Sequence, residues 1–515
     1  MKQKIGNIAA VVFLLVVLIE TAGCSLKTSI SQSVVTTQSA QITELGNSSE
    51  QLLSQIDPSW KLGREDSNGA TFYNVDTISP DGKHVAYQAS TGDNKFFMVM
   101  DNTFGKPYDG VYDLIFSPDS QRLVYIARDG DNYLVVVDGH EGKRYPALVP
   151  IDTHESDTSP LSSLVFSPDS RNLAYVVQTG GKSLVVKNGV EGKSYDEIPS
   201  DIRDTIPCIT FSQDSKKMAY PAGTGNKEFM VINGIAGNLY DHVSPIIFSP
   251  DGKHNTYTAG QGDKRFSVID GKDQDDRVIF RTFSPDSRHT VCAAGLPGNQ
   301  WIVEDGKAGP HYTQILGLVF SPDSRRMVYG AVLADNDFVV INGVEGKHYQ
   351  RSSYDDISGI TFSLDSKRIA YVVRQTDKWF MVIDGSEGKQ YSNVSNPVFS
   401  PDSRRIAYTA NNGFLDCVAV IDGVESEVYN WIYTSPVFSP DSKYVAYAVQ
   451  MDCKELLVCN GLEDKAYDWI FESFNWEINW FSSTIIFDSP NSLHYLAESG
   501  NSIYLVEKTI KKGKM

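Results

Sequence analysis

The chain has 515 residues, of which 41% are hydrophobic and 21% charged, and its 46 Lys and Arg against 64 Asp and Glu give a formal net charge of −18. The apolar fraction excludes a mostly disordered chain. The acidity excludes a broad nucleic-acid surface, because the neutralisation of phosphates needs clustered Lys and Arg. Length alone predicts about three domains.

The first residues have the features of an export signal. Lys2 and Lys4 precede an unbroken apolar run of 12 residues, Ile8 to Ile19. This run is shorter than the roughly 20 residues of a membrane-spanning helix, but it suits the core of a signal peptide.

The four residues that follow, Thr21-Ala22-Gly23-Cys24, resemble the lipobox of bacterial lipoproteins, with Thr21 in place of the usual Leu. The resemblance implies that residues 1–23 are removed and that Cys24 carries the lipid. The mature protein would then lie in the cell envelope, lipid-anchored on the extracytoplasmic side of a bacterial membrane. The alternative is an ordinary signal peptide with an incidental cysteine.

Residues 24–58 are rich in Ser, Thr and Gln. Such a segment buries too little apolar surface to fold alone. We therefore expect a flexible tether that holds a folded part of the chain clear of the membrane.

The rest of the chain repeats one unit, which begins with a Phe followed by Ser-Pro-Asp. Copies of this unit start at Phe116, Phe166, Phe248, Phe283, Phe320, Phe399 and Phe438, and weaker copies start at Ile78, Phe211, Phe362 and Phe487. Within the copy at Phe166, apolar runs alternate with turn residues four times. Four short antiparallel strands, repeated about every 40 residues, are typical of the blades of a β-propeller.

The sequence Phe-Ser-Pro-Asp-Ser followed by Leu-Ala-Tyr resembles the WD-like propeller repeats of the TolB family and of related peptidase propellers. The resemblance covers about residues 70–507 and implies an all-β propeller of about eleven four-stranded blades. The element Val-x-Asp-Gly-x-Glu-Gly-Lys-x-Tyr, one copy of which ends at Tyr145, is not part of the general TolB pattern. It indicates a distinct subgroup.

Eleven copies exceed the 4 to 8 blades of a typical ring. We therefore expect two rings, with blades 1 to 5 in residues 59–280 and blades 6 to 11 in residues 281–515, divided where the copy near Asp270 to Arg281 is shortest. One large ring is the alternative. It is favoured by a last copy that ends after about three strands, because Trp60 to Val75 could supply the missing outer strand.

Residues that recur in most copies cannot mark a unique site, so the Ser-Pro-Asp acids, the Ala-Tyr pairs and the Gly-Lys-x-Tyr elements are expected to be scaffold. Function on this fold should lie where the repeat is broken. The uniform turns share one face of the propeller, and the variable hairpin turns and inter-blade connections share the other. The variable face is the expected recognition face.

Two insertions break the repeat, at residues 146–163 and 469–481. The first offers acids and a histidine that could bind a divalent cation but that polar loop composition explains better, so no metal site is expected. The second offers aromatics that would either stack on a sugar or anchor a protein partner when exposed, or plug a ring when buried. Burial is slightly favoured. The candidate binding residues are Asp152, His154, Glu155 and Asp157 in the first insertion and Trp469, Phe471, Phe474, Trp476 and Trp480 in the second.

The chain contains no Gly-x-Ser-x-Gly, His-Glu-x-x-His or Gly-rich phosphate motif, so we expect no catalytic residue and no cofactor. The leading hypothesis is a non-catalytic binding or scaffold module for a protein, peptide or glycan, attached to a membrane through its lipid only. One alternative is a hydrolase or lyase with acids at the ring mouth. The other is an envelope-assembly component, as the resemblance to TolB would imply.

Overall fold

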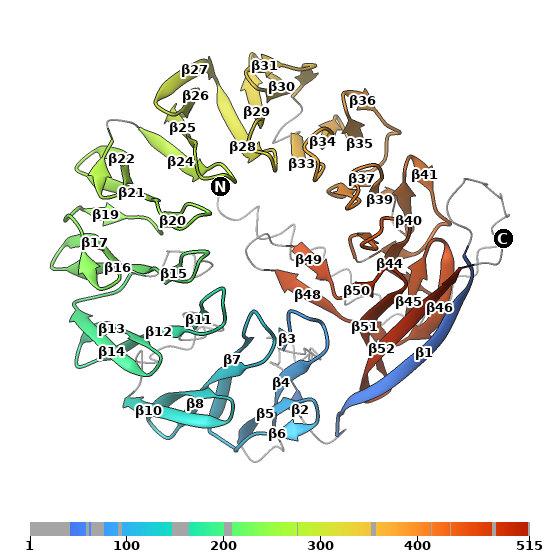
Figure 1. Ribbon diagram of the computed structural model, residues 1–515, viewed down its shortest axis with the longest axis horizontal. Helices are drawn as coiled ribbons and strands as arrows, with labels where there is room; N and C mark the ends of the chain where they lie inside the picture. Colours follow the sequence, from blue (N-terminus) through green and yellow to red (C-terminus); the bar gives the residue numbers. More distant parts are fainter. Residues whose placement is uncertain are drawn as a thin grey trace.

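The computed structural model describes residues 42–57, 61–62, 77–90, 95–146, 164–199, 209–274, 277–351, 357–413, 415–432, 434–475 and 480–512. These residues form 52 strands. Eleven antiparallel sheets of four or five strands follow one another as the blades of one ring (Figure 1). Within the described ranges there is no helix, and hence no helical segment long and apolar enough to cross a membrane.

Blade 3 illustrates how the repeat folds. Its strands run outward from the ring centre in the order β11 (Val165–Phe166), β12 (Leu173–Thr179), β13 (Lys182–Lys187) and β14 (Val190–Tyr195). We refer to such strands as A, B, C and D. Strands B and C are buried on both faces by the neighbouring blades, which is why they read as continuous apolar runs rather than as alternating ones.

The other ten blades have the same order. In the first half of the ring they are β2 (Lys61–Leu62), β3 (Thr77–Ile78), β4 (Val85–Ser90), β5 (Phe96–Met100) and β6 (Thr103–Phe104) in blade 1; β7 (Gly110–Phe116), β8 (Leu123–Asp129), β9 (Asn132–Val137) and β10 (His140–Pro146) in blade 2; β15 (Thr210–Phe211), β16 (Met218–Thr224), β17 (Lys227–Ile232) and β18 (Ile235–Ala236) in blade 4; and β19 (His242–Val243), β20 (Ile247–Phe248), β21 (Asn255–Gln261), β22 (Lys264–Ile269) and β23 (Lys272–Asp273) in blade 5.

In the second half they are β24 (Val278–Phe283), β25 (Thr290–Leu296), β26 (Asn299–Glu304) and β27 (Lys307–Tyr312) in blade 6; β28 (Gln314–Phe320), β29 (Met327–Leu333), β30 (Asn336–Ile341), β31 (Val344–Glu345) and β32 (Tyr349–Gln350) in blade 7; β33 (Ile357–Phe362), β34 (Ile369–Gln375), β35 (Lys378–Ile383) and β36 (Ser386–Glu387) in blade 8; β37 (Asn393–Val394), β38 (Val398–Phe399), β39 (Ile406–Gly413), β40 (Asp416–Ile421) and β41 (Val424–Glu425) in blade 9; β42 (Trp431–Ile432), β43 (Val437–Phe438), β44 (Val445–Met451), β45 (Lys454–Cys459) and β46 (Leu462–Tyr467) in blade 10; and β47 (Trp469–Ile470), β50 (Ile486–Ser489), β51 (Ser492–Ser499), β52 (Ser502–Lys512) and β1 (Ile42–Gln55) in blade 11.

Because the strands are antiparallel, the A–B and C–D turns of every blade lie on one face of the ring, the A–B face. The B–C turns and the connections between blades lie on the other, the B–C face. The Ser-Pro-Asp-Ser turns belong to the A–B face, as Ser167 to Ser170 between β11 and β12 do.

The eleven blades form a single ring rather than two. Strands β21 and β22 of blade 5 contact β24 of blade 6, so the ring continues through the boundary at residues 280 and 281 that the sequence suggested (Figure 1). The expectation of two rings is therefore wrong, and the alternative of one large ring is the observed arrangement. Blade number is set by how closely neighbouring blades pack, which the repeat length does not reveal.

The ring is closed by a strand from the start of the described chain. Strand β1 pairs with β52 from Ile42 opposite Lys512 to Gln55 opposite Ser502, and so forms the outer strand of blade 11. The expected tether of residues 24–58 is thus wrong for residues 42–55, and the closing strand is not the expected Trp60 to Val75. Lys61 and Leu62 instead pair with β4 of blade 1.

The Ser-Pro-Asp-Ser turns link neighbouring blades. In blade 2, the Ser117 hydroxyl donates to Asp119 at 2.6 Å, and the Asp119 backbone N–H donates to the Ser170 hydroxyl of blade 3 at 2.9 Å. Seven further links of this kind join Asp81 to Ser120, Asp169 to Ser215, Asp251 to Ser287, Asp286 to Ser324, Asp323 to Ser366, Asp365 to Ser403 and Asp402 to Ser442. The recurring acids are therefore structural.

The Glu-Gly-Lys-x-Tyr element links blades near the rim. Lys143 and Tyr145 of blade 2 both donate to Glu191 of blade 3, at 2.6 and 2.9 Å. Lys389 and Tyr391 of blade 8 do the same to Glu425 of blade 9. The tyrosines of this element also pack edge to face against the B-strand tyrosine of the next blade, as in the pairs Tyr108–Tyr125, Tyr195–Tyr220, Tyr240–Tyr257, Tyr312–Tyr329, Tyr429–Tyr447 and Tyr467–Tyr495.

Candidate functional site

A hairpin interrupts the innermost strand of blade 11. The two halves of that strand, β47 and β50, both pair with β51. Between them the chain forms β48 (Glu472–Asn475) and β49 (Trp480–Ser483), which pair only with each other. In Figure 1 this hairpin lies inside the ring, toward its centre.

The equivalent break in blade 9 shows how much chain has been inserted. There β37 and β38 are separated by three residues, Ser395 to Pro397, and the Ser395 N–H donates to the Thr409 carbonyl. In blade 11 the Phe471 N–H donates to the Leu496 carbonyl in the same way. Phe471, Thr484 and Ile485 therefore correspond to the blade 9 connection, and residues 472–483 are the insertion.

The predicted aromatic residues fall into two groups. Trp469 begins the inner strand and is 38% exposed, whereas Phe471 is only 6% exposed and packs with Leu53, Val85 and Leu496 in the core between blades 11 and 1. The prediction of Phe471 as a binding residue is therefore wrong, because its position belongs to the blade. Phe474 lies in β48 opposite Phe481, and Trp480 lies in β49 opposite Asn475.

The remaining predicted residues, Trp476, Asp152, His154, Glu155, Asp157 and Cys24, lie outside the described residues. Nothing tests these predictions. Within the described ranges, no three His, Cys, Asp or Glu side chains gather in a group that could hold a metal ion.

A buried carboxyl group that sequence reasoning missed holds the start of this inner strand. Oε2 of Glu455 accepts the Ile470 N–H at 2.6 Å, and its Oε1 has no hydrogen-bond partner in the described part of the chain. Burial raises the pKa of Glu455 to about 8. Gln300 makes the same bond to Ile315 at 2.8 Å, so a neutral side chain serves this position in blade 6. The sequence signal for this role is a Glu or Gln that follows the B–C turn.

A second carboxyl group near Trp469 is also protonated more readily than usual. Glu498 lies opposite Trp469 in the strand register. Burial, with a smaller contribution from the charge of Asp468, raises its pKa to about 7. Asp468 itself is bonded to Lys454 and to the Gly500 N–H, which lower its pKa. At neutral pH this part of the B–C face therefore carries less negative charge than its sequence implies.

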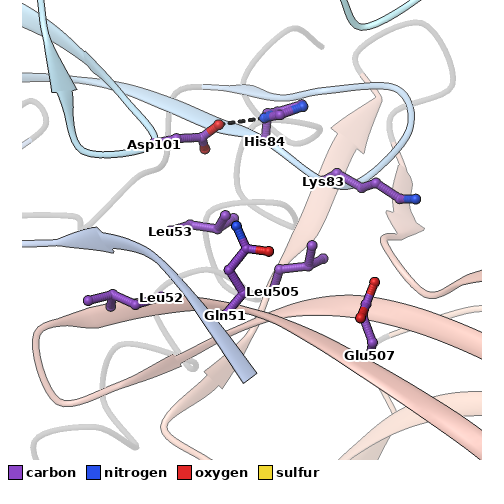
Figure 2. A pocket seen from close by; sticks show the side chains of 8 residues that line it. All are labelled: Gln51, Leu52, Leu53, Lys83, His84, Asp101, Leu505 and Glu507. Atoms are coloured by element: carbon purple, nitrogen blue, oxygen red, sulfur yellow. Dashed lines mark hydrogen bonds and ion pairs between the residues drawn. The ribbon is translucent and has the colours of Figure 1, made fainter. Parts of the chain in front are cut away.

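A cavity of about 350 Å³ lies at the closure between β1, β52 and blade 1. Figure 2 shows His84 and Asp101 at its edge, with Nδ1 of His84 2.5 Å from Oδ2 of Asp101. The pair resembles a catalytic dyad in isolation. It recurs, however, as His254–Asp270 and His289–Asp305, both at 2.7 Å, and with Arg for His as Arg368–Asp384. In each case the carboxylate ties the C–D turn to the B strand, so the pair is scaffold.

No protein-family model matches the chain, and no curated protein matches it. Solved structures are similar at the level of the fold. A eukaryotic initiation factor has a TM-score of 0.38 at 12% identity, with 68% of this chain and 96% of that chain covered. The Dos1 propeller has a TM-score of 0.28 at 9% identity, with 60% and 93% covered. The dihydro-heme d1 dehydrogenase NirN has a TM-score of 0.32 at 12% identity, with 65% and 78% covered. At these identities and TM-scores, the similarities do not indicate a function.

Proposed function

We propose that the protein is a non-catalytic binding module that engages a protein, peptide or glycan through the hairpin of residues 472–483 and the adjoining B–C face. The observation that carries the proposal is the position of this hairpin. It is inserted at a break that blade 9 closes with three residues, and it lies on the inside of the ring (Figure 1). The repeated turns are occupied by contacts between blades and offer no such feature.

We further propose that the protein is an envelope lipoprotein anchored through Cys24, in line with the resemblance of its repeats to TolB. The course of β1 supports an orientation. Its first residue, Ile42, pairs with Lys512. Lys512 lies two residues beyond Ile510, whose N–H donates to the carbonyl of Asn491 in the A–B turn of blade 11. The chain from Cys24 thus joins the ring at the A–B face, so the B–C face would point away from the membrane. Cys24→Ser should abolish incorporation of labelled palmitate, and persistent labelling would contradict the anchor.

The role proposed is binding rather than catalysis because the catalytic-looking pairs of the described residues belong to the repeat. His84–Asp101 is one of several equivalent pairs, and each Ser-Pro-Asp acid is bonded within its own turn, as Asp169 is to Ser167. Glu455 is buried and accepts the Ile470 N–H, and Gln300 accepts the Ile315 N–H in the same way.

The proposal is tested by deletion of residues 472–483. The deletion leaves Phe471, Thr484 and Ile485 between the two halves of the inner strand, the number that blade 9 has, and keeps Phe471 in the core. We expect the melting temperature to stay within about 2 °C of the wild type, which corresponds to about 2 kcal/mol or less for a chain of this size. We expect crosslinking capture of the partner from intact cells to be lost.

Val190→Ser/Ile235→Ser is the matched control, because it removes two exposed apolar side chains from C–D turns on the opposite face. It should leave capture unchanged. Equal capture by the folded deletion variant and the wild type would refute the proposal. A deletion variant that unfolds would show that the hairpin is part of the scaffold, which would refute it equally.

A further inference from the structure

The interface between blades 11 and 1 lacks an apolar contact that most other blades make beside the A–B turn. At those interfaces the sixth position of the C strand shares an apolar cluster with the Phe that begins the next Ser-Pro-Asp turn, as Val137 of blade 2 does with Phe166 of blade 3. The equivalent pairs are Met100–Phe116, Ile232–Phe248, Ile341–Phe362, Ile383–Phe399 and Ile421–Phe438. At the closure the two positions are occupied by Glu507, the sixth residue of β52, and by Ile78. A carboxylate and a smaller apolar side chain thus take the places of the packed pair.

The closing strand also lacks the residues that link blades near the rim. From Glu50 to Ser54 it reads Glu-Gln-Leu-Leu-Ser where the repeat has Glu-Gly-Lys-x-Tyr. Leu52 therefore stands at the position of the repeat lysine and Ser54 at that of the tyrosine. Phe104 of blade 1, which pairs with β5 as Glu141 pairs with β9, stands at the position of the accepting glutamate. The charged link of the other rims cannot form from these residues.

The closing strand can carry a glutamine where the repeat has glycine. A Cβ atom on Gly142 would lie only 2.9 Å from the carbonyl oxygen of Val135, so the repeat requires glycine there. This close approach belongs to the bulge in β10. In β1 the bulge comes after Leu52 instead, and Gln51 pairs in regular register with Leu505. The side chain of Gln51 is therefore accommodated.

These substitutions account for the cavity of about 350 Å³ at the closure (Figure 2). Its apolar wall is formed by Leu53 and Leu505, each 6% exposed, and by Leu52, which is half-exposed. The volume lies at the lower end of the roughly 300 to 1,000 Å³ that ligand sites occupy in proteins. The cavity therefore suits a small ligand with an apolar part.

The polar lining of the cavity offers mainly hydrogen-bond acceptors. Oε2 of Glu507 accepts the Ser49 hydroxyl at 2.9 Å, whereas its Oε1 makes no hydrogen bond or ion pair with a described residue. The amide group of Gln51 likewise has no partner among the described residues. Because Nδ1 of His84 donates to Asp101, Nε2 of the neutral ring is an acceptor. Figure 2 shows these groups on opposite sides of the cavity, Gln51 and Glu507 on blade 11 and the histidine on blade 1.

We propose that this cavity binds a small aliphatic amine in its ammonium form. The ammonium group donates to the carboxylate of Glu507 and to the amide oxygen of Gln51, and the alkyl chain covers the leucines of the apolar wall. The lysine of the lining, Lys83, lies 3.2 Å from Asp488, so its charge is compensated and that of Glu507 is not. The cavity therefore selects a cation over an anion. This site goes beyond the binding role proposed above and does not depend on the hairpin of residues 472–483.

Blade 6 separates the contribution of the cavity from that of the carboxylate. Glu304 is the sixth residue of β26 and so stands where Glu507 stands in blade 11. The next turn, however, begins with Phe320, which packs against the core between blades 6 and 7. A site that needed only the carboxylate would recur at Glu304, whereas a site that needs the cavity would not.

The inference is tested by calorimetric titration of the purified full chain with n-pentylamine at neutral pH. We expect a dissociation constant on the order of 0.1 to 1 mM, as suits a ligand of about six non-hydrogen atoms. Pentanoate, an anion of similar length, should bind at least tenfold more weakly.

Two variants and a matched control locate the site. Glu507→Gln should weaken binding about fivefold, which is the strength of an exposed ion pair, and Glu304→Gln should leave it unchanged. Ile78→Phe restores the residue of the repeat and fills the space beside Glu507. It should weaken binding at least tenfold without lowering the melting temperature.

Four results would overturn the inference: a dissociation constant of pentylamine above about 10 mM, equal binding of pentanoate, equal effects of the two Glu→Gln changes, or wild-type binding by folded Ile78→Phe. The variant that lacks residues 472–483 should bind pentylamine as the wild type does, and loss of binding in that variant would contradict the position of the site. The cavity and the hairpin can therefore fail independently, since amine binding tests the first and capture from cells tests the second.

Discussion

Blade 11 and the interface between blades 5 and 6 both depart from the repeat, but in opposite ways. Blade 11 replaces the missing repeat contacts with new ones. Glu50 of β1 accepts bonds from Lys465 and Tyr467, both at 2.7 Å, as the repeat glutamates do, and the Ser54 hydroxyl meets that of Tyr87 at 2.8 Å where other blades pair two tyrosines.

The interface between blades 5 and 6 instead substitutes polar residues for apolar ones. Thr256 lies where blade 7 has Val328, and Arg281 lies where blade 7 has Leu318. Cys292 replaces the B-strand tyrosine. Arg281 donates to the Ser267 hydroxyl at 2.9 Å, but the buried hydroxyl of Thr256 has no partner among the described residues.

The difference teaches that this ring accommodates the loss of repeat residues in two ways, by new contacts at blade 11 and by polar substitutions between blades 5 and 6. Blade 11 lacks some residues of the repeat, and strand β1, more than 400 residues earlier in the chain, supplies the corresponding contacts. The same loss at blades 5 and 6 is tolerated, because neighbouring interfaces keep those blades in place. The two regions should therefore respond differently to mutation.

The largest effect is expected where β52, the strand with which β1 pairs, contacts blade 10. Nζ of Lys508 lies 2.5 Å from Oδ1 of Asp464, and both side chains are only 6% exposed. Lys508→Met leaves the buried carboxylate without its cation, although the Tyr495 hydroxyl and the Lys465 N–H still donate to it, and should cost about 3 to 5 kcal/mol of unfolding free energy. The double variant Lys508→Met/Asp464→Leu should recover most of this loss, as measured by denaturant unfolding. A single variant as stable as the wild type would contradict the stabilising role assigned to this contact of blade 11.

The next effect depends on pH. Because burial raises the pKa of Glu455 from 4.5 to about 8, the folded chain keeps a proton there that the unfolded chain loses. The contribution of Glu455 to stability is therefore complete below about pH 4.5 and is lost as the pH rises to about 8, by about 3 to 5 kcal/mol.

Glu455→Gln should remove this dependence, since Gln300 shows that an amide can make the bond. We expect the melting temperature of the variant to exceed that of the wild type at pH 8 and to match it at pH 4.5. A difference between the two proteins that does not change with pH would show that Glu455 is ionised in the folded state.

The smallest effect is expected between blades 5 and 6. Thr256→Val removes a buried hydroxyl without a partner and should raise the unfolding free energy by about 1 kcal/mol. The reverse change in blade 7, Val328→Thr, should lower it by about 1 to 2 kcal/mol. If both changes have the same sign, the interface between blades 5 and 6 is not the weaker of the two.

The repeat made the blades predictable. The Phe-Ser-Pro-Asp turns and the apolar runs after them mark the A–B turns and the B strands, because turn chemistry and burial on both faces leave a direct trace in the sequence. The closing strand left little trace. Glu50 has the role of a repeat glutamate but stands in a Ser- and Gln-rich stretch, where β1 is recognisable only by its pairing with β52.

The candidate site was predictable in part for a similar reason. The insertion near Trp480 is visible as a break in the spacing of the repeat. Its direction toward the ring centre and the burial of Phe471 depend on how the inner strand of blade 11 resumes at Ile486, which spacing does not encode.

The most direct test of the central claim compares two variants in one experiment: deletion of residues 472–483 and Lys508→Met. The account predicts that the deletion variant keeps the wild-type melting temperature and loses partner capture from intact cells. It predicts that Lys508→Met lowers the melting temperature and, at a temperature where the ring is folded, captures the partner as the wild type does. Capture that is retained by the deletion variant, or that is lost in proportion to stability in both variants, would contradict the account.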